Sequence, residues 1–200
     1  MKHVPAFRPV YETKNNESPV GFRQFFRYKV RGVNAVPYWP VHPTSTIRGS
    51  WKNIYVGIDA APGISPGCYI QAVGKIYIDD YAQVAPNVGI ISANHFMLDI
   101  RRHIPGEVRI GKYCRIGMGS IIHPGVTLGD FTTVAAGSIV TKSFPKGYCV
   151  IGGNPAEIVE DYSENERIRS KFIRYRNECE YNGFIPAAQF EDFRKKNLNV

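Results

Sequence analysis

Aliphatic residues recur at every sixth position through the second half of the chain. Six of them follow one another without a gap: Ile110, Ile116, Ile122, Leu128, Val134 and Val140. The same spacing is present upstream at Ile78, Val84 and Ile90. A period of six fits neither the roughly 3.6-residue repeat of an α-helix nor the alternation of a β-strand. It indicates a short strand and a turn, repeated many times.

Three such units close one triangular coil of about 18 residues, and stacked coils pair their strands in parallel. The aliphatic side chains then form one continuous core, which no single coil buries alone. Gly or Ala follows four of the six aliphatic residues, as in Ile110-Gly111 and Val134-Ala135, and suits tight corners. The spacing therefore predicts a parallel β-helix. It does not fix the handedness, although the general rule for parallel crossovers favours a right-handed one.

The period breaks between Ile90 and Ile110, which lie 20 positions apart where an unbroken repeat gives 18. Residues 96–107, which include Pro105-Gly106, predict a loop that leaves one corner of the helix. Long loops in compact domains are usually functional.

Beyond Ala156 the pattern becomes helical. Ser163 to Glu166 fits a capping box, and apolar residues at helical spacing follow it: Ile168, Phe172, Tyr175 and Cys179. These features predict an amphipathic helix over 163–182, and a second short helix is expected over 187–195.

The predicted fold is therefore all-β: a hexapeptide-repeat β-helix with a protruding loop and a C-terminal α-helix. We expect three parts: a basic N-terminal cap over 1–53, the β-helix over 54–156 and a helical extension over 157–200.

The formal net charge is +8, and nearly all of the excess lies at the N-terminus. Residues 1–52 hold nine Lys or Arg against Glu12 and Glu17, a net charge of +7. Within them, residues 22–31 interleave aromatic and cationic side chains. The favoured interpretation is a solvated flank whose aromatics pack on the body. Contact with a membrane surface or a phosphate-bearing substrate stays open, whereas no nucleic-acid module is recognised and no such partner is expected.

No apolar run approaches the roughly 18 residues that span a bilayer, and the N-terminus lacks the apolar segment of a secretory signal. Both observations favour a cytoplasmic protein. The cysteines fit neither a zinc module nor a disulfide framework and are expected to be reduced: Cys68, Cys114, Cys149 and Cys179.

Residues 110–142, together with Gly153-Asn154-Pro155-Ala156, resemble the hexapeptide-repeat acyltransferases. Over residues 54–160 the chain is similar to galactoside and maltose O-acetyltransferases. It resembles more closely the branch of xenobiotic (chloramphenicol- and streptogramin-type) and capsule or O-antigen sugar acetyltransferases. The resemblance implies a left-handed β-helix and a homotrimer with active sites between subunits. It also implies acetyl-CoA as acyl donor, with no metal required.

Acetyl transfer needs a base that removes the acceptor proton, and histidine suits that task. His95 follows Ala85-Pro86-Asn87-Val88-Gly89-Ile90, a stretch that resembles the one before the family's catalytic histidine. The resemblance implies that His95 is the general base; the alternative is a corner histidine that only bonds the backbone. Asp99 resembles a loop acid of the xenobiotic branch and is predicted to orient His95 or contact the acceptor, although a solvated acid fits equally well.

The resemblance also assigns donor and acceptor positions. The backbone N–H of Met118 is expected to face the thioester oxygen. The donor-binding positions are Gly117, Met118, Ala136, Thr141, Lys142, Gly153, Asn154 and Pro155. The acceptor candidates are Tyr69, Gln71, Arg101, Arg102 and His103, the last three of which fit a solubility role equally well. Glu157 departs from the family, which often has Lys or Arg there to reach the 3′-phosphate of CoA.

The expected function is transfer of an acetyl group from acetyl-CoA to a hydroxyl or amino group of a sugar, in capsule or O-antigen polysaccharide biosynthesis. The alternatives are a xenobiotic O-acetyltransferase and a non-catalytic scaffold, although scaffolds tend to lose the base and the cofactor turn that this chain keeps. A β-helix carbonic anhydrase needs three zinc-bound histidines, two of them spaced H-x-x-x-x-H, and the chain has no such pair.

Overall fold

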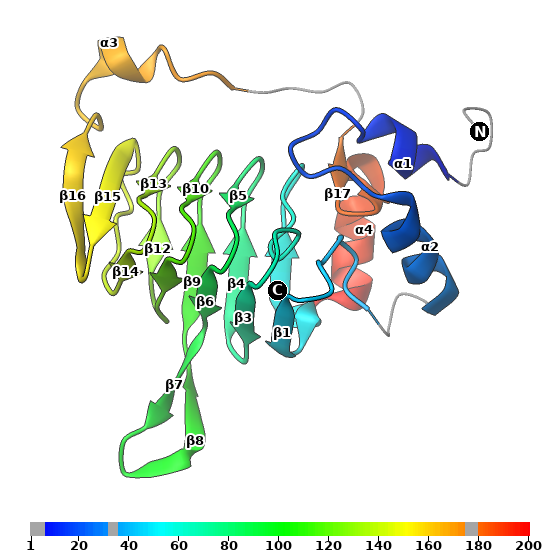
Figure 1. Cartoon of the computed structure of the whole chain (residues 1–200), viewed down its shortest axis with the longest axis horizontal. Coiled ribbons are helices and arrows are strands. Elements are labelled where there is room, and N and C mark those ends of the chain that lie inside the picture. The colour runs from blue at the N-terminus through cyan, green and yellow to red at the C-terminus, as the bar shows by residue number, and fades with distance from the viewer. Residues whose placement is uncertain (1–6, 32–35, 175–179) are drawn as a thin grey trace.

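The computed structural model describes residues 7–31, 36–174 and 180–200. Three sheets wrap around a common core to form a prism, and the chain climbs it coil by coil (Figure 1). Within the prism, neighbouring strands of successive coils pair in parallel. This is the parallel β-helix that the six-residue period predicts.

Each face of the prism is one sheet. The first sheet holds β1 (Thr46–Gly49), β3 (Tyr69–Ala72), β6 (Gly89–Ile91), β11 (Ile121–Ile122) and β14 (Ile139–Val140). The second sheet holds β2 (Ile54–Val56), β4 (Lys75–Ile78), β9 (Glu107–Ile110) and β12 (Thr127–Leu128). The third sheet holds β5 (Gln83–Val84), β10 (Arg115–Ile116), β13 (Thr133–Val134), β15 (Cys149–Gly153) and, antiparallel at its edge, β16 (Ala156–Asp161).

The repeat residues stack in register at the centre of the prism. Ile90 pairs with Ile70 on one side and with Ile122 on the other, and all three are 0% exposed. Each such buried side chain contributes roughly 1.5–3 kcal/mol, so the stack is the main source of stability. The first coil starts at Thr46, earlier than the predicted boundary at 54, because β1 pairs along its whole length with β3.

Aromatic residues line the corner between the second and third sheets; we call Tyr81, Tyr113, Phe131 and Tyr148 the aromatic ladder. Neighbouring rings stack with centroids 5.1, 4.6 and 5.0 Å apart. All four backbones have φ between 50° and 61°, which is unusual for bulky residues. Ring stacking contributes about 0.5–1.5 kcal/mol per pair beyond burial and offsets part of that strain.

The segment after β16 crosses the ladder as a strap over residues 163–174, and the predicted helix over 163–182 is wrong. Within the described part of this range, only α3 (Glu166–Arg169) is helical, capped by Asn165 rather than Ser163, and β17 (Tyr181–Asn182) is a strand. Phe172 packs against Phe131 and Tyr148, while Arg169 and Arg174 also lie over ladder rings. No single helical face presents residues 169, 172 and 174 together, so contact with the ladder overrides the helical pattern. Tyr175 and Cys179 lie outside the described residues.

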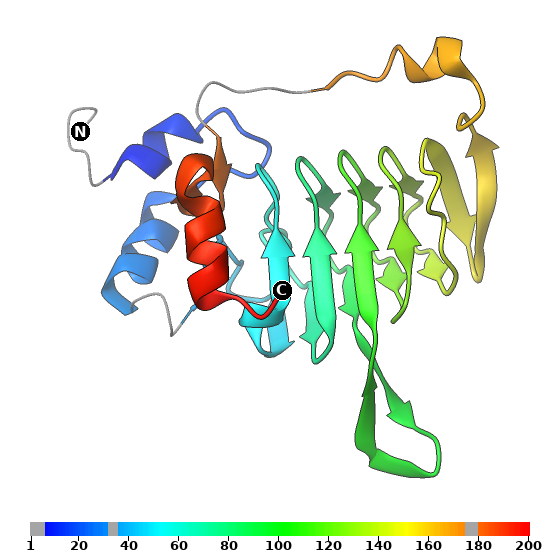
Figure 2. The ribbon, with the colours of Figure 1, turned by 180° about the vertical axis from the view of Figure 1, so that it is seen from behind.

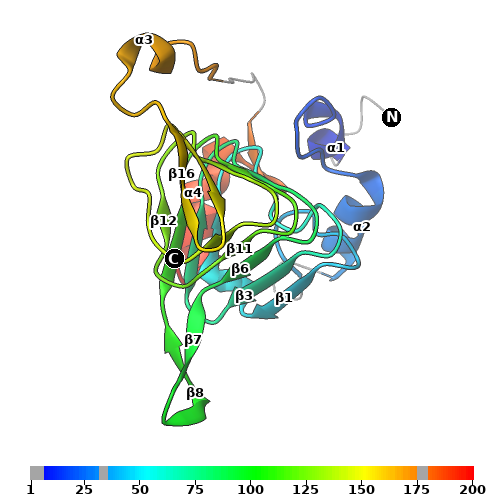
Figure 3. The same cartoon turned by 60° about the vertical axis from the view of Figure 1, so that its left-hand side comes forward.

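A two-stranded arm leaves the corner between the first and second sheets (Figure 3). It consists of β7 (Ala93–Phe96) and β8 (Asp99–Pro105), paired antiparallel. The predicted loop over 96–107 therefore starts earlier and is an ordered hairpin rather than an irregular loop.

Helices cover the N-terminal end of the prism (Figures 1 and 2). They are α1 (Arg8–Glu12), α2 (Phe22–Arg31), the 3-10 turn η2 (Trp51–Asn53) and α4 (Ala187–Asn197), with β17 paired to β18 (Ile185–Pro186) beside them. Tyr38 is fully buried between the first coil and α4, against Phe190 and Phe193. The second C-terminal helix is confirmed, whereas α1 and α2 were not expected from the sequence.

None of the helices in the described ranges combines the length and the apolar composition that a membrane span requires. Cys68, Cys114 and Cys149 are free and buried, as expected, and burial raises the pKa of the Cys114 thiol to about 12. Cys179 lies outside the described part of the chain.

Candidate active site

The root of the arm is fixed to the preceding coil. The Ser92 hydroxyl is fully buried, donates to the Gln71 carbonyl at 2.5 Å and accepts from the Gly74 N–H at 2.9 Å. The side-chain oxygen of Gln71 accepts from the Ala93 N–H at 3.0 Å. Gln71, a candidate acceptor residue, therefore anchors the arm through its side chain. This role could not be predicted from the sequence because Gln71 and Ala93 lie 22 positions apart.

His95 lies on β7 with its ring exposed. Its Nδ1 is 2.5 Å from the backbone carbonyl oxygen of Ile100. A carbonyl can only accept, so Nδ1 donates in this contact, and in the neutral imidazole the lone pair then lies on Nε2. This is the tautomer that a general base requires.

Asp99 does not contact His95. Its carboxylate accepts two hydrogen bonds from the Arg101 guanidinium, at 2.9 and 3.1 Å, and a third from the Arg101 backbone N–H at 3.2 Å. These bonds from Arg101 lower the pKa of Asp99. The Ile100 carbonyl takes the orienting role predicted for Asp99, and no side-chain pattern could have revealed it.

Of the other acceptor candidates, His103 and Arg102 lie on the same arm as His95, whereas Tyr69 lies on the body of the β-helix. His103 lies directly opposite on β8, with ring centroids 4.5 Å apart. The Arg102 guanidinium lies 5.1 Å from the Phe96 ring centre, on the same arm. Tyr69 is exposed in β3, one coil before the arm.

A second group of predicted positions lies at the corner between the third and first sheets. Gly117 to Ser120 form a turn closed by the Ser120 N–H on the Gly117 carbonyl at 3.2 Å. Met118 occupies its second position, where the N–H is not used by the turn, and no described residue accepts from it. A Cβ on Gly119 would meet nothing within 4 Å, so this corner is open to a ligand.

The next coil repeats this corner. Ala136 is followed by Gly137, whose φ of 71° matches that of Gly119. Gly153 continues the corner one coil on, where its N–H donates to the Ser138 hydroxyl at 3.3 Å, and Asn154 and Pro155 follow it. The corner therefore presents backbone groups from three successive coils along one line.

Thr141 and Lys142 lie at a different corner, after β14. The Lys142 ammonium forms an ion pair with Glu157 at 2.5 Å, with both side chains more than half exposed. Lys142 was predicted to meet a CoA phosphate. In this structure its ammonium is instead paired with Glu157, the residue that departs from the family pattern.

One copy of the chain does not bring these groups together. The arm with His95 leaves between the first and second sheets, whereas Met118 and Ala136 lie between the third and first. The width of the first sheet separates the two corners. Among the described residues, no group of three or more His, Cys, Asp or Glu side chains is arranged to hold a metal ion.

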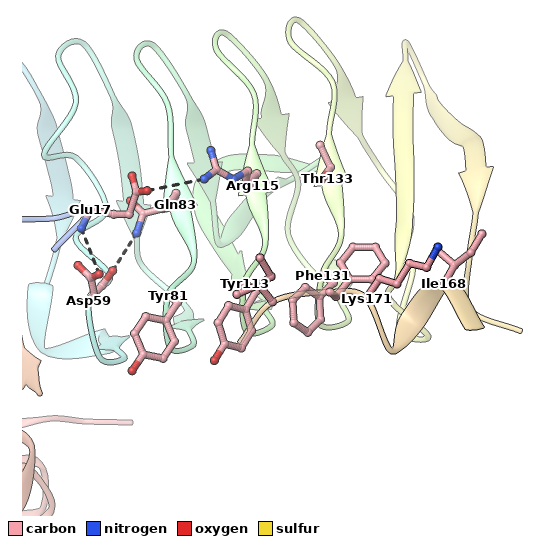
Figure 4. A pocket seen from close by; sticks show the side chains of 12 residues that line it. Glu17, Asp59, Tyr81, Gln83, Tyr113, Arg115, Phe131, Thr133, Ile168 and Lys171 are labelled. Atoms are coloured by element: carbon pink, nitrogen blue, oxygen red, sulfur yellow. Dashed lines mark hydrogen bonds and ion pairs between the residues drawn. The ribbon is translucent and has the colours of Figure 1, made fainter. Parts of the chain in front are cut away.

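A hollow lies between the third sheet and the strap, away from the arm and from the Met118 corner. It has a volume of about 400 Å³, and Tyr81, Tyr113 and Phe131 of the ladder line one side of it (Figure 4). Arg115 and Glu17, 3.9 Å apart, lie at its rim. It is remote from the arm and contains none of the predicted site residues.

Comparison with known proteins places this geometry in a family. Residues 107–142 match the bacterial transferase hexapeptide (six repeats) family. Nodulation protein L of Rhizobium meliloti is 40% identical over 125 residues, which cover 59% of this chain and 68% of that protein. The chain belongs to the hexapeptide-repeat transferase family.

Two other members of this family extend the comparison. Galactoside O-acetyltransferase of Escherichia coli is 33% identical over 98 residues, which cover 46% of this chain and 47% of that protein. The crystal structure of a maltose O-acetyltransferase from Clostridium difficile aligns with a TM-score of 0.56 and 27% identity, over 78% of this chain and 87% of that one. The chain spans about half to two thirds of the length of the curated relatives it matches.

Proposed function

We propose that this hexapeptide-repeat transferase moves an acetyl group from acetyl-CoA to a sugar hydroxyl, with His95 as general base. The observation that carries the proposal is the contact between His95 Nδ1 and the Ile100 carbonyl, which leaves Nε2 free to accept a proton. His95 lies on an ordered arm whose base is fixed by hydrogen bonds of Ser92 and Gln71, so the general base has a defined position. The similarity to a maltose O-acetyltransferase supports the reaction class.

The reaction follows from these groups. Nε2 of His95 takes the proton of the acceptor hydroxyl as its oxygen attacks the thioester carbonyl, a role worth about 10²–10⁴ in rate. The unused N–H of Met118 donates to the oxyanion that forms, typically worth about 10²–10³. Collapse of this intermediate breaks the C–S bond, and the imidazolium returns the proton to the CoA thiolate.

The donor lies along the open corner in this proposal. Met118 and Ala136 present backbone groups to the pantetheine arm from successive coils, and Asn154 and Pro155 follow one coil on. The N–H groups of Gly117 and Gly153 are bonded to the Val134 carbonyl and the Ser138 hydroxyl, so these two residues shape the corner instead. Thr141 and Lys142, near the nucleotide end, offer one cation that Glu157 already neutralises. We therefore expect the pantetheine contacts, rather than the 3′-phosphate, to dominate donor binding.

The active site is completed by a second copy of the chain. The corners that carry His95 and Met118 flank the first sheet, so a neighbour packed on that sheet can supply the missing group. The outward row of this sheet includes Ile121 and Ile139, both half-buried in one copy. The matching row of the third sheet holds Gln83, Arg115 and Thr133. An aliphatic face on only one of these sheets supports a homotrimer of left-handed β-helices, with one arm reaching across each interface.

The acceptor in this proposal is a sugar of a capsule or O-antigen precursor in the cytoplasm. Arg102 and His103 lie beside His95 on the arm and suit an acceptor that carries phosphate. Arg101 contributes less, since Asp99 neutralises it.

The test compares His95→Gln with His123→Gln, a histidine on the body of the β-helix. Calorimetry measures acetyl-CoA binding, and thiol release is followed over a panel of sugars and nucleotide sugars. We expect binding by all three proteins and loss of transfer by at least about 10²-fold in His95→Gln alone. Failure of the wild type to bind acetyl-CoA would refute the donor, and full turnover by His95→Gln would refute the base.

A further inference from the structure

An apolar stripe runs along the exposed side of α2. Phe22, Phe26 and Val30 follow one another at four-residue spacing, which places them on one face of the helix. They are 48, 57 and 68% exposed, respectively. Three large apolar side chains in a row, left open to water, are unusual on a small protein and indicate an interaction surface.

The rest of α2 is held on the body of the protein. Phe25 is 2% exposed and packs edge-on against Phe184, with centroids 6.1 Å apart. It also meets Phe7 at 6.2 Å, and Phe7 covers part of Phe22 at the start of the stripe, with ring centroids 5.1 Å apart. The helix is therefore anchored through Phe25 while the stripe faces outward.

Cations border the stripe on both sides. By helical spacing, Arg23 falls just beyond one edge and Lys29 just beyond the other, and both residues are exposed. The Lys29 ammonium lies over the Phe25 ring, 5.5 Å from its centre. They belong to the N-terminal 52 residues, whose net charge is +7. An aromatic stripe flanked by Lys and Arg is the pattern of a helix that lies in a bilayer interface.

The position of α2 suits a flat surface. It lies on the outside of the N-terminal end of the prism, whereas the arm projects from the middle of the prism toward another side (Figures 1 and 3). Docking through α2 would therefore leave the arm and the open corner free.

We infer that α2 docks this protein on an anionic phospholipid membrane. Phe22 and Phe26 enter the boundary between head groups and acyl chains, while Arg23 and Lys29 meet the phosphates. A second copy of the chain fits the stripe less well, because a self-complementary contact would bring two strongly cationic segments together. A single short helix binds weakly, so several copies in one oligomer would strengthen the attachment.

The experiment is cosedimentation of the 200-residue chain with lipid vesicles. One set is pure phosphatidylcholine and the other contains roughly 30% phosphatidylglycerol, which supplies the negative surface potential. We expect at least about tenfold stronger partitioning into the anionic vesicles, reversed by high salt. Binding that is absent, or equal for both vesicles, overturns the proposal.

Variants then locate the surface. Phe22→Ser/Phe26→Ser and Arg23→Glu/Lys29→Glu should each weaken binding by about tenfold or more. The matched control is Ile158→Ser/Val159→Ser, which removes two side chains 51 and 64% exposed on β16, at the opposite end of the prism. Thermal melts confirm that each variant is folded. If the α2 variants still bind like the wild type, or instead change the mass measured by light scattering, the stripe contacts something other than lipid.

Discussion

At the scale of single residues, the chemistry of this chain depends on backbone atoms as much as on side chains. The Ile100 carbonyl sets the tautomer of His95, and the Met118 N–H is the proposed oxyanion donor. Because both groups are backbone atoms, neither role depends on which side chain residue 100 or residue 118 carries. Substitution at these positions is therefore a poor test, and neighbours that support the base are better targets.

His103 is one such neighbour, since its ring packs 4.5 Å from that of His95. We expect His103→Ala to lower kcat by about tenfold, because His95 loses the packing that holds its ring. His103→Phe should restore most of the rate by refilling the space. If Ala and Phe lower kcat equally, or if only KM rises, His103 does not hold the His95 ring by packing and acts only through the acceptor contact proposed above.

Glu157 offers a second test, because it holds the charge of Lys142 at 2.5 Å. Glu157→Gln frees the ammonium for the 3′-phosphate of CoA, so acetyl-CoA should bind several-fold more tightly, as expected for one exposed ion pair. Calorimetry with CoA and 3′-dephospho-CoA measures the effect. The wild type should scarcely distinguish the two ligands, and a strong wild-type preference for CoA would contradict the assignment.

At the scale of elements, the arm is the feature that converts a solenoid into a candidate catalyst. Its root depends on the Gln71 side chain, which accepts from the Ala93 N–H at 3.0 Å. Gln71→Ala should increase hydrogen exchange across β7 and β8 and lower kcat, while leaving the melting temperature nearly unchanged. Gln83→Ala, a half-buried glutamine on the third sheet, is the control. Unaltered exchange in the arm of Gln71→Ala would show that Ser92 alone holds the root.

The sequence predicted these elements unequally, for physical reasons. Burial at Ile90 and Ile122 repeats every coil, so the period alone locates the strands. The break in that period predicted a protruding segment, but it did not predict that the segment pairs into the strands β7 and β8. The prediction of a helix over 163–182 was wrong because Phe172 packs on Phe131 of the aromatic ladder, and a contact between residues so far apart in sequence is invisible to a local pattern. The partner of Asp99 was not foreseen either: Arg101, two residues on, forms an ion pair with its carboxylate at 2.9 Å.

At the scale of the whole molecule, the aliphatic outer face of the first sheet predicts assembly. Light scattering should give a mass near three times the 22.5 kDa of one chain. Ile121→Asp/Ile139→Asp places charges on that face and should yield monomers without acetyl transfer, because the proposed site is shared by two copies. Thr133→Asp on the third sheet is the control and should remain assembled. A monomeric wild type that transfers acetyl groups would contradict the shared site.

The strap has a consequence for how the molecule comes apart. A stack of coils joined only to nearest neighbours can unzip from either end, one coil at a time. Here the chain leaves the last coil, lays Phe172 on Phe131 and Tyr148, and returns to the first, where the Asn182 amide donates to the Val56 carbonyl at 2.9 Å. Described residues on either side of 175–179 therefore pack on the last coils and on the first, so one stretch of chain contacts both ends of the solenoid. We therefore expect the stack of coils to unfold in one cooperative transition rather than coil by coil from an end.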